Sequence, residues 1–245
     1  MNDRHHLPAE TVRLPERGFA LDRRKALAAG VLCWIGFALI VWLVASGHAD
    51  RFDRAGLLMA RSGEQLGLAG PAALREIVRD VTALGGVVLR NLFALGAVVA
   101  LLFLRLRREA VLLAMTVIAG WLVNSALKHL VGRERPQIVP HLMDSVGQSF
   151  PSGHSFNAAA VYVAMALAFA AMSRRQWVRL AIIGTAMGLS AMVAWSRVLL
   201  GVHFPTDVVA GWLGGTGWAF LAAALLYQPA KAAADSTPLP HPRFS

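Results

Sequence analysis

Three short clusters hold the side chains of this sequence that are best suited to chemistry on an anion. The first reads KHLVGRERP from Lys128 to Pro136, the second reads PSGH from Pro151 to His154, and the third reads SRVLLGVHFPTD from Ser196 to Asp207. An arginine guanidinium binds two phosphate oxygens at once, and a lysine ammonium acts as a mobile point charge. The combination indicates a phosphate-binding site.

The candidate phosphate ligands are three cations and the start of a helix. The cations are Lys128, Arg135 and Arg197. PSGH stands where an apolar segment begins, so we expect the backbone N–H groups of Ser152, Gly153 and His154 to point outward from a helix N-terminus, a ready anion site. Gly153 also lets a ligand approach the backbone. A single cation could be an interfacial side chain reaching for water, but three together favour phosphate binding.

His203 and Asp207 form a candidate catalytic pair. They are four residues apart, with Pro205 at a plausible first helical position. Residues four apart share a helix face, so Asp207 is expected to accept the Nδ1 proton of His203 and leave Nε2 free to attack. Such a pair can also merely cap a helix. The second histidine, His154, and the three cations favour catalysis.

The acidic residues near the clusters do not suggest a metal site. They are Glu134, Asp144 and Asp207, and none of them pairs at a spacing typical of metal ligands. The negative charge of a phosphate would instead be matched by Lys and Arg. We therefore predict a metal-independent reaction without a cofactor.

Long apolar segments must position these clusters. Of the 245 residues, 56% are apolar and only 16% are charged, against about 25% charged residues in a typical soluble domain. A membrane-spanning helix needs roughly 20 mostly apolar residues, and six segments qualify. They are Ala26–Gly47, Ala83–Leu104, Ala110–Leu127, Ser155–Met172, Leu180–Trp195 and Val208–Tyr227. The sequence predicts an all-α, six-helix membrane bundle, and the single cysteine, Cys33, excludes an intramolecular disulfide.

The number of crossings places all three clusters on one side of the membrane. Two crossings separate His154 from Ser196, and no crossing separates Lys128 from His154. The termini lie on the opposite side, which carries the larger share of the Lys and Arg residues and is therefore expected to be cytoplasmic. The net charge of +10 fits a membrane surface or an anionic substrate. The hydropathy disfavours nucleic acid as a partner.

The remaining segments divide the chain into an N-terminal cytoplasmic segment (1–25), a six-span domain (26–227) and a tail (228–245). The extramembrane stretch 48–82 fits one or two short amphipathic helices. It is interpreted either as a packing cover over the bundle or as a lid over a lipid-entry cleft, and the first is favoured. Arg90, inside the second span, either lines the mouth of the site or extends to the interface, and the second is favoured. Gly211, Gly214, Gly215 and Gly217 suggest close helix packing within the bundle.

Taken together, the three clusters resemble the three-part signature of the type 2 phosphatidic acid phosphatase superfamily. The matching positions are Lys128-x6-Arg135-Pro136, Pro151-Ser152-Gly153-His154 and Ser196-Arg197-x5-His203-x3-Asp207. The resemblance implies that His203 forms a phosphohistidine, that Asp207 orients it, and that His154 protonates the leaving oxygen and then activates water. It also implies that the phosphate oxygens are held by Lys128, Arg135, Ser152, Gly153 and Arg197.

The function implied by the resemblance is a lipid phosphatase of the bacterial inner membrane with its site on the outer side. Candidate substrates are phosphatidic acid, phosphatidylglycerol phosphate, undecaprenyl diphosphate and the phosphates of lipid A. Two alternatives stay open. One is a lipid phosphotransferase using the same intermediate, and the other is a lipid-phosphate binding protein without catalysis. The sequence does not choose a substrate or an oligomeric state.

Overall fold

The computed structural model describes residues 22–173 and 175–226, which form eight helices and one short hairpin. The helices are α1 Arg23–Ala45, α2 Asp50–Leu58, α3 Ala72–Ala83, α4 Val87–Phe103, α5 Arg107–Val131, α6 Gly153–Ala170, α7 Gln176–Leu199 and α8 Pro205–Leu226. The hairpin pairs β1 Arg61–Ser62 with β2 Gly67–Leu68 in antiparallel fashion. The predicted segments 1–25 and 228–245 lie largely or wholly outside the described residues.

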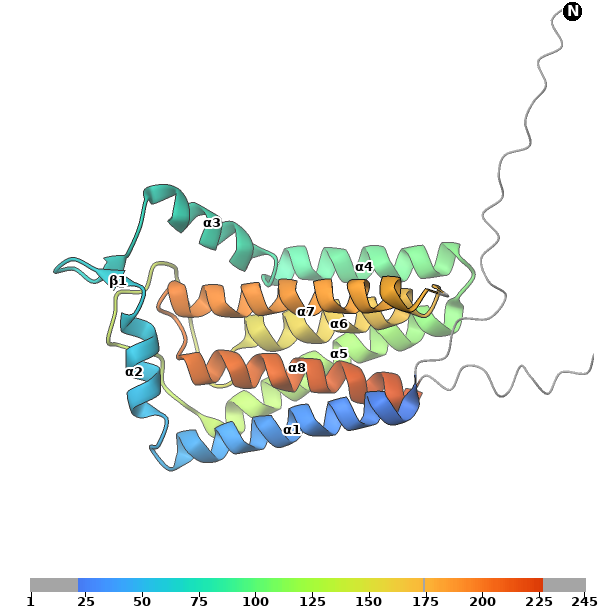
Figure 1. The fold of residues 1–245 in the computed structure, drawn as a ribbon, viewed down its shortest axis with the longest axis horizontal. Coiled ribbons are helices and arrows are strands. Elements are labelled where there is room, and N and C mark those ends of the chain that lie inside the picture. Colours follow the sequence, from blue (N-terminus) through green and yellow to red (C-terminus); the bar gives the residue numbers. More distant parts are fainter. Residues whose placement is uncertain (1–21, 174, 227–245) are drawn as a thin grey trace, which may run out of the picture.

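The six long helices run side by side along the length of the molecule (Figure 1). The helices α2 and α3 and the hairpin gather at one end of this bundle. The start of α1 and the end of α8 lie at the opposite end. The all-α class is confirmed, and the loops that carry the three clusters lie at the end away from the start of α1 and the end of α8.

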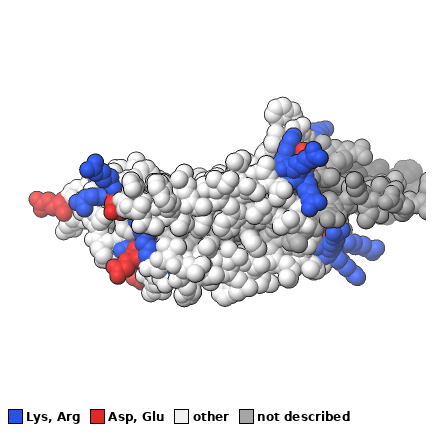
Figure 2. Space-filling view, turned by 90° about the horizontal axis from the view of Figure 1, so that it is seen from below, with Lys and Arg blue, Asp and Glu red and all other residues white. Residues whose placement is uncertain are grey.

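The expected six crossings correspond to five helices and one bent pair. The helices α1, α5, α6, α7 and α8 are each long and apolar enough to cross a membrane, and α3 and α4 together form a sixth candidate bent by 47°. With 17 residues, α4 alone rises about 26 Å. An uncharged band separates two charged ends (Figure 2), as expected for side chains that face lipid tails between two aqueous surfaces.

Two helices extend further into the clusters than the apolar pattern suggests. The helix α5 was expected to end at Leu127 but continues to Val131, and α7 continues past Trp195 to Leu199. Gly132 ends α5 because its left-handed backbone (φ 63°) turns the chain away. Lys128 and Arg197 therefore lie on the last turns of helices, where the partial negative charge of the helix C-terminus stabilises a cation. The predicted end of this span at Leu127, which left Lys128 outside the helix, is therefore wrong.

Glycines of α8 bring the start of α6 close to the start of α8. A Cβ atom added at Gly211 would lie 2.7 Å from the carbonyl oxygen of Ser152, and one at Gly215 would clash with that of Phe156. Gly217 faces α1 in the same way, because its added Cβ would lie 2.9 Å from Cβ of Cys33. These contacts confirm the predicted packing within the bundle.

The helices α2 and α3 cover the end of the bundle that carries the clusters. Leu57 of α2 is buried against Val198 and Val208, and Val78 of α3 is buried with Leu200 and Val202. Arg61 of the hairpin donates to the carbonyl oxygen of Leu199 at 2.9 Å. The two amphipathic helices and the packing role expected for segment 48–82 agree with this arrangement.

Candidate active site

The three clusters meet around one cavity of about 720 Å³ at the covered end of the bundle. The end of α5, the loop 132–152, the start of α6, the end of α7 and the turn before α8 surround it. Six of the eight predicted site residues line it, and these are Lys128, Arg135, Gly153, His154, Arg197 and His203. Ser152 and Asp207 are not among the lining residues and are fully buried.

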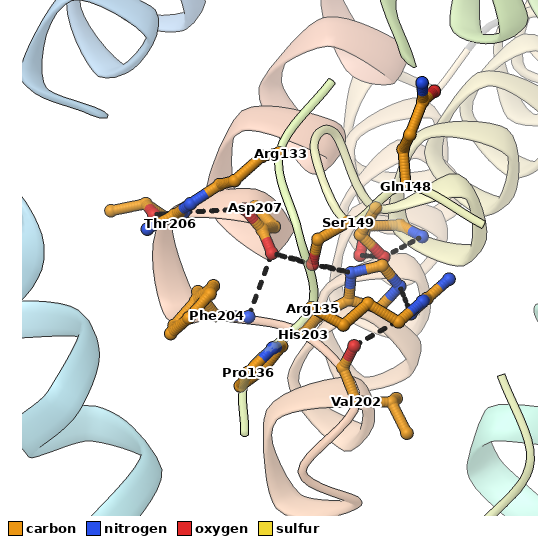
Figure 3. A network of polar contacts seen from close by, with 12 residues as sticks. Arg133, Arg135, Pro136, Gln148, Ser149, Val202, His203, Phe204, Thr206 and Asp207 are labelled. Atoms are coloured by element: carbon orange, nitrogen blue, oxygen red, sulfur yellow. Dashed lines mark hydrogen bonds and ion pairs between the residues drawn. The ribbon is translucent and has the colours of Figure 1, made fainter. Parts of the chain in front are cut away.

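The hydrogen bonds of His203 identify which ring nitrogen carries the proton. Nη1 of Arg135 lies 3.1 Å from Nε2 of His203, and a guanidinium can only donate. Nε2 is therefore the unprotonated acceptor, and the proton of the neutral ring lies on Nδ1. The ring is almost completely buried, His203 is one of the residues that line the cavity, and Nε2 lies beside Arg135 (Figure 3).

Ser149 connects His203 to Asp207. Its hydroxyl donates to Oδ2 of Asp207 at 2.5 Å and lies 3.2 Å from Nδ1 of His203, whose proton it can accept (Figure 3). The direct distance from Nδ1 to Oδ2 is 3.6 Å, too long for a hydrogen bond. The expected direct bond is thus replaced by a bridge. The reason is that His203 precedes α8, which begins at Pro205, so the two residues do not share a helix face.

Asp207 is held by two further donors. The backbone N–H of Phe204 donates to Oδ2 at 3.0 Å, and Nη1 of Arg133 donates to Oδ1 at 2.8 Å. The carboxylate therefore accepts three hydrogen bonds, which offset the cost of its burial. Its position relative to Ser149 is fixed from both sides.

Arg133 joins Asp207 to the extramembrane helix α2. Its Nη2 lies 2.7 Å from Oδ2 of Asp53, which is 1% exposed. Asp53 also accepts hydrogen bonds from the backbone N–H and the hydroxyl of Thr206, at 2.9 and 2.6 Å. The ring of Phe204 lies 4.1 Å from the guanidinium carbon, a cation–π contact. Burial disfavours the charge of Arg133, but Asp207 and Asp53 outweigh it and raise its pKa.

The electrostatic environment keeps His203 neutral. Burial lowers the pKa of His203 to about 4, and the nearby Arg135 and Arg197 act in the same direction. The negative charge of Asp207, which is linked to the ring through Ser149, opposes this shift without overcoming it. At pH 7 the imidazole therefore has a free lone pair on Nε2, which is the form a nucleophile needs.

The three predicted cations are held by protein oxygens and by one sulfur. Lys128 donates to the carbonyl oxygen of Gln148 at 2.8 Å, and Arg135 donates to those of Val146, Gly147 and Val202. Arg197 donates to Thr82 and contacts the sulfur of Met143, while its buried Nε has no partner among the described residues. Burial lowers the pKa of Arg135, although Asp207 partly offsets the effect. All three point positive charge at the cavity.

The PSGH segment starts α6 but does not present all of its amides to the cavity. The side chain of Ser152 caps the helix by accepting from the N–H of Ser155, and its own N–H donates to the carbonyl oxygen of Asp207 at 3.0 Å. The expectation that the Ser152 N–H points outward is wrong, because the close approach of α8 supplies it with a partner. Gly153 and His154 line the cavity, and amides of a first helical turn have no acceptor within the helix.

A second cavity of about 640 Å³, a mainly apolar groove, meets the first at Gly153 and His154, which line both. Residues of α4, α5 and α6 form it, among them Leu95, Ile118 and Val161. Arg90 is the one charged residue among the described residues that line the groove besides the titratable His154. It is 5% exposed and donates to the carbonyl oxygen of Gly85 at 3.1 Å. The favoured interpretation that Arg90 extends to the interface is therefore wrong.

Three residues of this site were missed in the sequence. Arg133 is a basic residue two positions before Arg135, but its spacing did not distinguish a buried ion-pair partner from an exposed surface charge. Ser149 precedes the PSGH segment without a signal of its own. Asp53 lies in the extramembrane stretch, far from the clusters along the chain, and only the packing of α2 on α8 brings it to Arg133.

Among the described residues, no group of three His, Cys, Asp or Glu side chains could hold a metal ion.

The apolar band and the cation-lined cavity at one end of the helices define an integral membrane protein. The family model of the PAP2 superfamily matches residues 108–231, half of the chain. This protein belongs to the PAP2 superfamily, which confirms the resemblance noted in the sequence.

Several named proteins are similar to this chain. Phosphatidylglycerophosphatase B of Bacillus subtilis is 35% identical over 146 residues, which cover 56% of this chain and 68% of that protein. Lipid A 1-phosphatase of Rhizobium etli is 35% identical over 51% of this chain and 54% of its own length. A putative undecaprenyl-diphosphatase of Escherichia coli is 34% identical over 43% of this chain and 49% of its own length. The chain thus matches about half of the last two proteins.

One solved structure is similar over most of the fold. It is the crystal structure of a transmembrane PAP2 type phosphatidylglycerolphosphate phosphatase from Bacillus subtilis. It matches with a TM-score of 0.71 and 27% identity, over 79% of this chain and 93% of that one.

Proposed function

We propose that this protein is a membrane phosphatase that removes a phosphate group from a lipid through a phosphohistidine on His203. The observation that carries the proposal is the unprotonated Nε2 of His203, which lies beside Arg135 at a cavity lined by two further cations. The names of the relatives, all phosphatases of lipids, support the same reaction class.

The first step transfers the phosphoryl group to His203. Nε2 attacks phosphorus, an N–P bond forms, and the bond from phosphorus to the leaving oxygen breaks. Arg135 releases Nε2 and moves its N–H to a phosphate oxygen, while Lys128 and Arg197 neutralise the remaining charge. The Nδ1 proton stays on the ring and is stabilised through Ser149 by Asp207. His154, at the junction of the two cavities, gives a proton to the leaving oxygen.

The second step returns the enzyme to its starting state. His154, now neutral, accepts a proton from water, and the resulting hydroxide oxygen attacks phosphorus. The N–P bond breaks, phosphate leaves, and Nε2 regains its lone pair. No step requires a resident metal, because Lys128, Arg135 and Arg197 take the role that a metal would have in neutralising the phosphate.

The apolar groove supports a lipid as the substrate. It reaches His154 from among helices of the apolar band and is lined by Leu95, Val98 and Ile118. A hydrocarbon tail in this groove would place its headgroup at the cation-lined cavity. The active site is proposed to face the outer side of the membrane, since the opposite end carries Arg23, Arg24, Lys25, Arg105, Arg107 and Arg108.

The test is a phosphate-release assay in detergent with phosphatidic acid, phosphatidylglycerol phosphate, undecaprenyl diphosphate and lipid A, each with and without EDTA. We expect release from at least one lipid, unchanged by EDTA, and its loss in His203→Ala with lipid binding retained. Chromatography of labelled lipids separates free phosphate from phosphate passed to a second lipid. Activity of His203→Ala at the parental rate, or activity lost in EDTA and restored by Mg²⁺, contradicts the mechanism.

A further inference from the structure

Arg90 is a buried cation without a counter-charge among the described residues. Its side chain is held by two neutral acceptors, the carbonyl oxygen of Gly85 at 3.1 Å and Oδ1 of Asn91 at 3.4 Å. Its buried Nε has no hydrogen-bond partner within the described part of the chain. None of the ion pairs found there includes Arg90. A charge buried among apolar side chains is costly unless a partner accompanies it, so an unpaired one suggests an anionic ligand.

The position of Arg90 identifies which part of a substrate it faces. Gly85, which accepts the hydrogen bond of Arg90, also packs on His154, since a Cβ added at Gly85 would lie 3.3 Å from Cδ2 of that ring. Arg90 and His154 both line the apolar groove, but Arg90 does not line the cavity that holds Lys128, Arg135 and Arg197. Arg90 is thus on the tail side of His154.

We propose that Arg90 binds a second phosphorus-centred anion, located between the scissile phosphate and the lipid tail. This inference rests on the proposed function, in which His154 protonates the leaving oxygen. The chemical group that follows the leaving oxygen then enters the groove next to Arg90. The substrate that fits this site is a lipid with two phosphorus centres. The two centres share one bridging oxygen in an isoprenoid diphosphate and are separated by glycerol in phosphatidylglycerol phosphate. A lipid with one phosphate has no second anion for Arg90 to pair with.

The same contact would assist the chemical step for a diphosphate. When the bond between the outer phosphorus and the bridging oxygen breaks, that oxygen and its electron pair remain on the lipid monophosphate. The negative charge increases next to Arg90 as the bond breaks. A preorganised cation at that position stabilises the transition state more than the bound substrate.

The test compares kcat/KM for dioleoyl phosphatidic acid, dioleoyl phosphatidylglycerol phosphate and undecaprenyl diphosphate in the parental protein, Arg90→Gln and Arg90→Lys. The first two lipids have identical tails, and their ratio within one preparation is independent of the fraction of folded protein. We expect Arg90→Gln to lower the ratio of two-phosphorus lipid to phosphatidic acid by about tenfold or more, as for one lost charge-assisted hydrogen bond. Arg90→Lys should retain part of the preference because it retains the charge.

Leu95→Ala is the matched control, since Leu95 lines the same groove from the same helix without charge. It should leave the ratio for the two dioleoyl lipids unchanged. Equal losses on all three lipids in Arg90→Gln would mean that Arg90 only supports the fold, and this overturns the inference alone. A parental protein that releases phosphate neither from these three lipids nor from lipid A overturns the proposed function. A larger effect on the diphosphate or on the glycerol-spaced lipid supports the inference and identifies which of the two sources fits.

Discussion

Arg133 Nη1 lies 2.8 Å from Asp207 Oδ1, so a residue outside the cavity lining holds the carboxylate that Ser149 links to His203. The other terminal nitrogen of Arg133 pairs with Asp53 of α2. The chain of contacts from Asp53 through Arg133 and Asp207 to Ser149 thus connects the extramembrane segment to the proposed nucleophile. Segment 48–82 therefore supports the site as well as covering it.

Loss of Arg133 should destabilise the protein more than loss of Asp53. Arg133→Gln leaves two buried carboxylates without their counter-charge, and removing one partner of a buried pair costs about 3–5 kcal/mol. Asp53→Asn leaves Arg133 paired with Asp207. In the double variant the losses should be less than additive, because the two residues share one interaction. Unfolding in detergent, followed by tryptophan fluorescence, measures these differences.

The control for that series is Arg54→Gln, which removes an exposed charge from the same helix. It should change the unfolding free energy by less than about 0.5 kcal/mol. Additive losses for Asp53→Asn and Arg133→Gln would contradict the coupling.

Ser149→Ala should reduce turnover with little effect on lipid binding. The hydroxyl is the link between Nδ1 of His203 and Oδ2 of Asp207, and a hydrogen bond to a charged group contributes about 1.5–3 kcal/mol. We expect kcat to fall by roughly 10- to 150-fold, and Ser149→Thr to retain much of the activity. Parental kcat in Ser149→Ala would show that Asp207 acts on His203 without the bridge.

His203 should remain neutral well below the pH at which a free histidine titrates. Its pKa is lowered to about 4 by burial, so the ring is neutral above this pH and becomes protonated only as the pH falls through it. The fraction of His203 in the neutral, nucleophilic form therefore does not increase when the pH rises through 6.5. Ring nitrogen chemical shifts of ¹⁵N-labelled protein in detergent, compared with His203→Gln to assign the signal, measure this. A titration midpoint near 6.5, or a proton on Nε2 at pH 7, would disprove the inferred state.

Arg197→Ala should weaken transition-state binding. Arg197 lines the cavity and its buried Nε is without a protein partner among the described residues. Losing one preorganised donor costs about 3 kcal/mol of transition-state stabilisation. Inhibition by vanadate, which adopts a five-coordinate geometry resembling phosphoryl transfer, should weaken in parallel with kcat/KM. The exposed Arg54→Gln is again the control and should change neither quantity, and undiminished vanadate inhibition in Arg197→Ala would exclude Arg197 from the phosphate site.

Gly215→Ala should separate α8 from α6. An added Cβ would clash with the carbonyl oxygen of Phe156, so α8 has to shift, and Asp207 shifts with it. We expect lower stability and strongly reduced turnover. Gly188→Ala on α7 is the matched control, because nothing lies within 4 Å of its added Cβ and alanine is favoured over glycine in a helix by about 0.5–1 kcal/mol. Equal behaviour of the two variants would show that the close approach is unnecessary.

The residues and crossings that the sequence determined by itself are those that depend on local pattern. The apolar runs are long enough to identify the spans, and the two crossings between His154 and Ser196 put all clusters at one end. The types of Lys128, Arg135, Arg197, His154 and His203 indicate an anion and a nucleophile without any coordinates. The spans and the common end of the clusters could be predicted because hydrophobic length and crossing parity are properties of the chain alone, whereas the anion and the nucleophile stay predictions.

The tertiary structure decided which polar atoms lie within hydrogen-bond distance of one another. Asp53 reaches Arg133 because α2 packs on the start of α8. The N–H of Ser152 is hydrogen-bonded to Asp207 because the glycines of α8 allow α6 to approach closely. Ser149 replaces a direct contact between His203 and Asp207 because the helix begins only at Pro205. Arg90 faces the groove instead of the interface because it is held by Gly85, at the break between α3 and α4. Hydrogen bonds act over so short a range that helix packing, and not residue spacing, determines their partners.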